Sequence, residues 1–366
     1  MKIAAPRSLR SRVRLLLCGL ACGLLAAVLS GCQAIGFYKQ AITGQCQILT
    51  HQQPISRLIA DPQTPAPLKA KFEQILKIRQ FAADQLHLPA GQSYLKYADL
   101  HRPFVVWNVN LAPALSLAPK TWWFPVVGRA SYRGYFNEQA ARNYANDFAK
   151  KGWDVYVDGI ETYSTLGWFN DPLLNTFINE PDSYLAEIIF HELTHRRLFV
   201  PGDTDFNEAF ATFVSMEGLR RWFLASSNPQ GYDHYRVGLD QDRQFVGLVT
   251  AARDQLQAIY DDPKLTVPAK LARKQQIIAQ LRAQHDALKA SWGGASPFDD
   301  WFAEPINNAK LNTVSAYYDL VPAFAALLHS NHGDLEEFYQ AVARLGKLPI
   351  QRRHQELEAC LHQELP

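Results

Sequence analysis

Residues 182–211 read DSYLAEIIFHELTHRRLFVPGDTDFNEAFA, and this stretch decides the fold more than any other. Its apolar periodicity predicts a helix over 183–199, with Asp182 or Ser183 as the N-cap. A Pro-Gly pair ends that helix, and a second helix is predicted over about 205–225. Two helices joined by so short a turn are expected to pack against each other.

The first of these helices carries the pattern H-E-x-x-H at residues 191–195. Side chains four residues apart lie on the same face of a helix, so His191 and His195 can reach one cation. Glu192 is rotated by about 100° from His191, where its carboxylate can take a proton from an attacking water. The pattern predicts a zinc site with Glu192 as the general base. A surface helix with incidental histidines is the alternative.

A catalytic zinc site needs a third protein ligand and an open position. A third histidine in the common close spacing is excluded, because Leu198 and Pro201 stand where that pattern needs Gly and His. Glu208, early on the second helix and separated from His195 by 12 residues, is the predicted third ligand. Asp205 is the alternative ligand, although an Asp at that place is more often a helix N-cap.

The rest of the chain divides into a mixed N-terminal part and a helical C-terminal part. The first has predicted helices at 68–86 and 137–152 and predicted strands at 104–111, 122–127, 131–136 and 153–158. The second has predicted helices at 234–260, 267–291, 313–329 and 335–345, the last with a capping box of Asp334 and Glu337, and an irregular segment at 297–310. The predicted class is α+β and helix-rich, with a small mixed sheet in residues 32–160 and the H-E-x-x-H helix in residues 161–366. One continuous domain over 32–366 is the alternative.

The first 31 residues read as a lipoprotein signal peptide. Five basic residues precede an apolar run over 15–29, which is shorter than the ~20 residues that span a bilayer. The run ends in LSGC at 29–32, which resembles the bacterial lipobox, and Gln33 resembles the outer-membrane sorting pattern. The resemblance implies lipid on Cys32 and a periplasm-facing location in the bacterial cell envelope. An ordinary signal peptide or an uncleaved anchor is the alternative.

Charge and cysteine content limit the partners and the compartment. Removal of the signal peptide changes the formal charge from +2 to −3, and no nucleic-acid partner is expected from that balance. Two further cysteines remain, Cys46 and Cys360. In an oxidising compartment they can pair and tie the two ends of the chain together, and two free thiols are the alternative.

The HELTH motif, the segment PGDTDFNEAFATFV at 201–214 and the lipobox together resemble the bacterial putative aminopeptidase family, whose members are described as zinc-dependent lipoproteins. The segments PVVGRASYRGYF at 125–136 and NNAKLNTVSAYYDLVPAF at 307–324 also resemble it. The two-His, one-Glu pattern resembles the gluzincins, which implies a zincin-like fold and a peptide substrate. Thr212 stands where thermolysin-like enzymes have an acidic residue, and the G-x-M-E-N segment of one large aminopeptidase group is absent.

Peptide hydrolysis also needs a donor for the developing oxyanion, and Tyr317 and Tyr318 are the candidates. An aminopeptidase must in addition neutralise the substrate's ammonium, and Glu161 and Glu187 are the candidates for that. The ordinary roles of these four are core packing, a loop charge and an ion pair with Arg or Lys. The sequence predicts a membrane-tethered zinc metallopeptidase, with the aminopeptidase label taken from the family. The alternative is a lipoprotein binding or assembly factor that keeps a zinc site without turnover.

Overall fold

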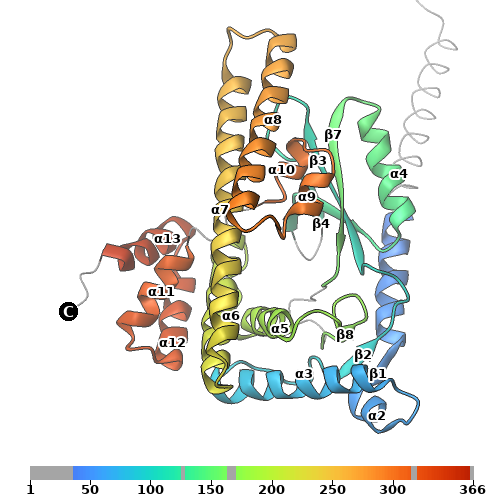
Figure 1. The fold of residues 1–366 in the computed structure, drawn as a ribbon, viewed down its shortest axis with the longest axis vertical. Helices are drawn as coiled ribbons and strands as arrows, with labels where there is room; N and C mark the ends of the chain where they lie inside the picture. The colour runs from blue at the N-terminus through green and yellow to red at the C-terminus, as the bar shows by residue number, and fades with distance from the viewer. Residues whose placement is uncertain (1–35, 125–127, 163–169, 315–319, 363–366) are drawn as a thin grey trace, which may run out of the picture.

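The computed structural model describes residues 36–124, 128–162, 170–314 and 320–362. The signal segment, Cys32, Tyr317 and Tyr318 lie outside these ranges. The fold is helix-rich with three small sheets, so the predicted α+β class is confirmed (Figure 1). No helix within the described ranges has the length and apolar character that crossing a bilayer requires.

The central sheet is antiparallel and has the order β6-β3-β7. Strand β3 (Val106–Pro113) pairs with β6 (Tyr132–Tyr135) on one side and with β7 (Trp153–Ile160) on the other. Helix α4 (Glu138–Ala149) packs on it and begins at Asn137, whose side chain accepts a hydrogen bond from the backbone as an N-cap. Apolar residues alternate along β3, which gives the sheet a buried face.

Two smaller sheets flank the central one, with the order β1-β2-β8 and the hairpin β4-β5. Their strands are β1 (Gln52–Pro54), β2 (Lys96–Ala98), β8 (Leu173–Leu174), β4 (Trp122–Phe124) and β5 (Gly128–Ala130). Residues 36–50 form a helix before β1, and α2 (Ile55–Ala60) and α3 (Ala66–Gln85) follow it. Helix α3 runs along the base of the molecule in the view of Figure 1.

The remaining elements are helical and follow the sheets in the chain. They are α5 (Asp182–Arg197), α6 (Thr204–Ala225), α7 (Pro229–Asp261), α8 (Val267–Ser291), α9 (Asp299–Ala303), α10 (Asn308–Leu311), α11 (Val321–Ser330), α12 (Leu335–Gly346), α13 (Ile350–Ala359) and the 3₁₀ turn η1 (Cys360–His362). The 33-residue α7 runs from the base to the top of the molecule and pairs there with α8 (Figure 1). It therefore links the main core to a separate upper hairpin, which has its own hydrophobic cluster.

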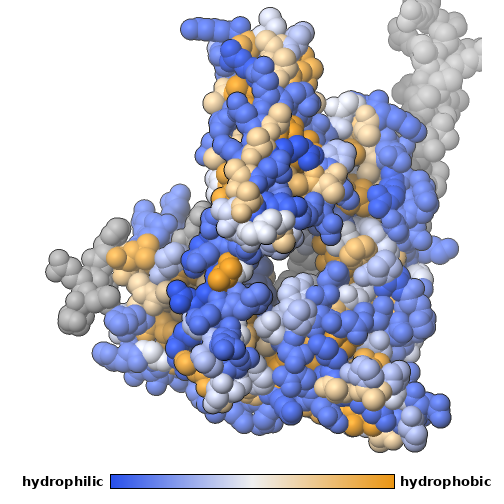
Figure 2. All heavy atoms as spheres, in the orientation of Figure 1, coloured by the Kyte–Doolittle hydropathy of each residue, from blue (hydrophilic) through white to orange (hydrophobic). Residues whose placement is uncertain are grey.

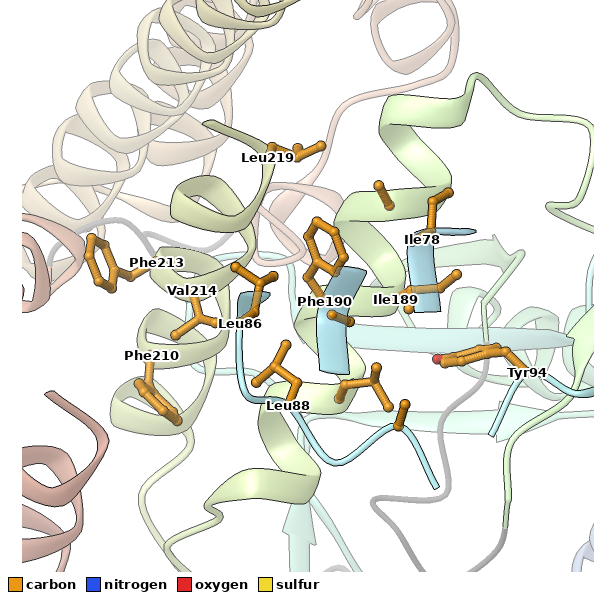
Figure 3. Close-up of a cluster of buried hydrophobic side chains, with 14 of the residues drawn as sticks. Ile78, Leu86, Leu88, Tyr94, Ile189, Phe190, Phe210, Phe213, Val214 and Leu219 are labelled. Atoms are coloured by element: carbon orange, nitrogen blue, oxygen red, sulfur yellow. The ribbon is translucent and has the colours of Figure 1, made fainter. Parts of the chain in front are cut away.

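The main hydrophobic core surrounds α5 and α6. Phe190 of α5 lies between the two helices near Leu86 and Leu88, which come from the segment after α3 (Figure 3). Gly218 of α6 faces this ring, because a Cβ at that position would lie 2.7 Å from Phe190 Cδ2. The absence of a side chain at Gly218 thus lets α5 and α6 approach closely. Residues from both sides of position 160 contribute to this core.

A buried polar network ties the upper hairpin to the central sheet. Lys274 of α8, only 4% exposed, donates to the Asp154 carboxylate of β7 and to the Ala114 carbonyl. The backbone N–H of Asn308 also donates to Asp154, and Tyr260 donates to the Asn308 side chain. Because these groups are paired, their burial fixes the place of α8 and α10 against the sheet.

The helices predicted at 68–86, 137–152, 234–260 and 267–291 are confirmed as α3, α4, α7 and α8, with shifted ends. The segment 297–310 was expected to be irregular, but it contains α9 and α10. These two helices have only five and four residues, and the network around Asn308 holds α10 in place. So few residues produce no periodic pattern that a sequence could reveal.

Two helix starts also differ from expectation. Helix α5 has Pro181 as its N-cap residue and no side-chain cap, in place of Asp182 or Ser183. The N-cap of α6 is Asp203, which accepts a hydrogen bond from the backbone N–H of Phe206. Of the two alternatives for Cys46 and Cys360, the structure has two free thiols, and Sγ of Cys360 lies 3.5 Å from the Glu356 carbonyl.

Candidate metal centre

Helices α5 and α6 bring together the three predicted ligands. The Nε2 atoms of His191 and His195 lie 3.1 Å apart. Glu208 Oε2 lies 3.2 Å from His191 Nε2, and Glu208 Oε1 lies 3.5 Å from His195 Nε2. Among the described residues, these three form the group of His, Cys, Asp and Glu side chains that could hold a metal ion. Asp205 is exposed and is not part of the group.

The spacing of these donor atoms fits a tetrahedral zinc site. Ligand atoms bound at about 2.0–2.1 Å from one ion are separated by roughly 3.3 Å when the geometry is tetrahedral. The two imidazole nitrogens, 3.1 Å apart, lie close to that value, and each has one oxygen of the Glu208 carboxylate beside it, Oε2 at 3.2 Å from His191 and Oε1 at 3.5 Å from His195. The donor set of two imidazoles and one carboxylate is also the set that zinc prefers in open sites with three protein ligands.

Asn207 fixes the turn that directs Glu208 toward the histidines. Its side chain is 1% exposed and pairs with the backbone of Val200 twice, accepting from the N–H and donating to the C=O, both at 2.8 Å. The connection between α5 and α6 is therefore tied to the first turn of α6. Sequence reasoning had given Asn207 no role, although its place directly before Glu208 was the available signal.

A buried ion pair holds the start of α6 from the other side. Asp203, the N-cap, accepts hydrogen bonds from Arg353 and lies 2.9 Å from His354 Nε2. Arg353 is 6% exposed and also donates to the carbonyls of Leu345 and Leu348. The C-terminal helix α13 thus supports the helix that carries Glu208.

The charges in the centre stabilise one another in the metal-free state. Burial alone would raise the pKa of Glu208, but hydrogen bonds from His191 and His195 lower it to about 2. Burial alone would lower the pKa of His191, but the hydrogen bond to Glu208 and the nearby carboxylates Glu192 and Glu187 raise it above its ordinary value. The carboxylates therefore favour a positive charge at the histidines, and binding of a cation there requires the same preference.

Glu192 is not part of the group that could hold a metal ion. Its Oε2 atom is buried and has no hydrogen-bond partner within the described ranges. Tyr94 is buried nearby, and its burial and the charge of Glu192 raise the pKa of its hydroxyl well above 10. Figure 3 shows the Tyr94 ring beside Ile189 with its hydroxyl directed toward α5. A buried carboxylate oxygen without a partner is costly, and such groups occur where a site needs them.

Both candidate amine anchors lie near the first turns of α5. Glu187 accepts a hydrogen bond from Tyr235 of α7, and burial and the charge of Asp242 raise its pKa. Burial and the charge of Glu180 raise the pKa of Glu161. No Arg or Lys forms an ion pair with Glu161 or Glu187 in the part of the chain that the structure describes. The expected ion pair of Glu187 is thus replaced by the Tyr235 hydroxyl.

The face of the molecule that Figure 2 shows has a hollow near its middle. In Figure 2 this face is hollowed just above the place that α5 occupies in Figure 1, below the upper hairpin. A separate cavity near the start of α4 is lined by Arg102, Trp107 and Arg142 and contains none of the candidate ligands.

Comparison with known proteins agrees with the motif analysis. The model of a protein family described as "Putative aminopeptidase" matches residues 36–357, which is most of the chain. No curated protein and no solved structure gives a significant match. The match begins at the first described helix and extends into α13, so it includes α5, α6 and the support from Arg353. On this evidence the chain belongs to the putative aminopeptidase family.

Proposed function

We propose that the protein is a zinc metallopeptidase, tethered by lipid on Cys32 to a bacterial membrane facing the periplasm. The observation that carries the proposal is the cluster of His191, His195 and Glu208, in which the two imidazole nitrogens lie 3.1 Å apart and each has a Glu208 oxygen within 3.5 Å. These three side chains would hold the ion. When bound, Zn²⁺ would act as a Lewis acid and make a water molecule acidic enough to lose a proton near neutral pH.

Glu192 is the general base in this proposal. It neighbours His191 in the sequence but is not part of the three-residue cluster, and its carboxylate, whose Oε2 has no hydrogen-bond partner within the described ranges, would accept the proton of the attacking water. A purely structural zinc site is usually closed by four ligands and rich in Cys, and this cluster has three ligands and no Cys. These features support turnover over the alternative of a binding or assembly factor.

The expected outcome for Glu192→Gln is full retention of zinc with loss of peptidase activity by about 10²–10⁴-fold, the usual contribution of a general base. Metal content of the purified protein and cleavage of a peptide library are the two measurements. Glu73→Gln, an exposed change on α3, is the matched control and should alter neither. Undiminished hydrolysis by the Glu192 variant would contradict the mechanism.

The finer part of the proposal is exopeptidase action, in which Glu187 binds the ammonium group of the substrate's free amino terminus. Glu187 lies one turn before His191 on α5, and Asp242 is a second carboxylate close enough to raise its pKa. Two carboxylates with raised pKa values gain from an incoming ammonium, which restores their charged forms. The free amino terminus of a peptide would thus be held beside the metal ligands.

Glu187→Gln should reduce cleavage of a peptide with a free amino terminus and leave cleavage of its N-acetylated form unchanged. If Glu161 is the anchor, Glu161→Gln gives that result and Glu187→Gln does not. The measurement is kcat/KM for each peptide of the pair on each protein. Equal cleavage of both peptides by the unaltered protein would identify an endopeptidase.

A further inference from the structure

The helix over residues 36–50 has two faces with different neighbours. Its inner face packs on the protein: Ile48 is buried in the main core, and Gly44 lies against the ring of Phe136. Gln40 accepts a hydrogen bond from the Phe136 backbone N–H. The orientation of the helix is therefore fixed, and so is the direction of its outer face.

An apolar stripe runs along that outer face. Tyr38, Ile42 and Leu49 are 43%, 65% and 40% exposed. Positions 38, 42 and 49 lie within about 40° of one another around the helix axis at 100° per residue. Cys46, which is also exposed, borders the stripe, and Gln47 lies on the polar side. Isolated exposed apolar residues are normal, but a stripe with helical spacing indicates a contact surface.

A second exposed aromatic residue lies at the same end of the molecule. Phe37, at the start of the helix, contacts Phe124 of β4 with ring centroids 5.9 Å apart. The neighbouring Trp123 is 68% exposed, the highest value among the large exposed hydrophobic residues of the described ranges. Trp and Tyr with apolar bodies and polar tips are the side chains that prefer a membrane–water interface.

The charge of these segments suits an anionic bilayer. Residues 33–60 and 100–137 contain no Asp or Glu, although the chain has 35 such residues. Lys39 and Arg129 are exposed on the helix and on β5, and neither forms an ion pair within the described part of the chain. Exposed Lys and Arg near a surface attract anionic headgroups by about 1 kcal/mol each.

The proposed lipid attachment point limits how far this surface can lie from the membrane. Tyr38 follows Cys32 by six residues, and even a fully extended chain of that length spans only about 20 Å. The helix start and the β4-β5 hairpin are therefore held near the headgroups whenever Cys32 carries lipid.

We propose that the stripe of Tyr38, Ile42 and Leu49, together with Trp123, is a membrane-contact surface that lies on the phospholipid bilayer. This inference rests on the lipid anchor of the proposed function. The lipid on Cys32 supplies the attachment, and the surface adds a contact of buried apolar area next to it. The contact also sets the orientation of the protein, because the inner face of the helix is fixed to the core.

Cys46 provides a native probe for this contact. The full-length lipidated protein with Cys360→Ser is labelled at Cys46 with a fluorophore and reconstituted into phosphatidylcholine–phosphatidylglycerol vesicles that contain a headgroup nitroxide lipid. The control carries the fluorophore on the polar side, through Gln47→Cys with Cys46→Ala. Because contact buries a helix face only about 5–10 Å into the interface, quenching at Cys46 should exceed that at the control by about twofold or more.

Two further variants test the stripe itself. Ile42→Asp should lower the quenching at Cys46 to the level of the control, whereas Thr43→Asp, an exposed change on the polar side, should leave it unchanged. Protein that floats with the vesicles but shows equal quenching at both probe positions would overturn the surface and leave the anchor intact. Protein that does not float with the vesicles would overturn the anchor and the surface together. Neither result depends on peptidase activity.

Discussion

At the scale of single residues, each helix of the candidate metal centre has a proposed ligand next to a residue with a different task. Glu192 follows His191 and keeps a free carboxylate oxygen, whereas Asn207 precedes Glu208 and locks the turn at Val200. Neighbouring residues on a helix point about 100° apart, so a ligand's neighbour cannot share its ion. The adjacent positions are therefore available for proton transfer on α5 and for support on α6.

The identity of the third ligand can be tested by replacing each of the two candidates, Glu208 and Asp205, with alanine. Glu208→Ala should remove zinc, because it takes away one of three ligands and the carboxylate that lies between both histidines. Asp205→Ala should keep a full complement of zinc, since Asp205 is exposed and outside the cluster. Elemental analysis of both purified variants decides the matter. Zinc retained by the first and lost by the second would assign the ligand to Asp205.

The sequence was sufficient to predict that His191, His195 and Glu208 come together, but not what supports them; that they hold zinc stays a prediction. His191, His195 and Glu208 follow from fixed helical spacing and a short turn, which are local properties. The contribution of Arg353 to Asp203 joins residues 150 positions apart, and the charge of Glu192 acts on Tyr94, which comes from another part of the chain. No local pattern reports such contacts. Tyr317 and Tyr318, the predicted oxyanion donors, lie outside the described residues and stay predictions.

At the scale of elements, the metal centre depends on how closely α5 and α6 approach. Phe190 lies between them, and Gly218 provides the space for its ring. The long helices were predictable from periodicity, because amphipathic patterns persist over many turns. The residue at which α6 begins was not predictable from the sequence, because Asp203 and Asp205 have the same capping chemistry. Only the tertiary ion pair with Arg353 favours Asp203 as the N-cap.

Gly218→Ala should destabilise the protein by about 1–3 kcal/mol, the usual cost of overpacking a core. The added methyl would lie 2.7 Å from Phe190 Cδ2 and 2.8 Å from Leu86 Cδ1, so a buried side chain must move. Gly247→Ala is the control, because nothing lies within 4 Å of its Cβ position in α7. That change should stabilise by roughly 0.5–1 kcal/mol through helix propensity. Urea unfolding measures both, and a neutral Gly218→Ala would contradict the close approach.

At the scale of the whole molecule, three groups of elements converge on α5 and α6. The central sheet and α3 contribute from the N-terminal part, α7 contributes Tyr235, and α13 contributes Arg353. The main core joins residues from Ile48 to Leu357, so its folding requires nearly the full chain. The centre is therefore expected to be lost when distant segments are disturbed.

Arg353→Met tests this dependence on the C-terminal helix. The variant leaves Asp203, which is 3% exposed, without its guanidinium partner, and removal of one partner from a buried ion pair costs about 3–5 kcal/mol. The adjacent Arg352 pairs with Glu356 on the exposed side of the same helix, so Arg352→Met should cost only about 0–0.5 kcal/mol. Urea unfolding midpoints and zinc affinity are measured for both variants. Because Asp203 caps the helix that carries Glu208, zinc affinity should fall in the Arg353 variant alone. Equal unfolding midpoints for the two variants would show that α13 does not support the centre.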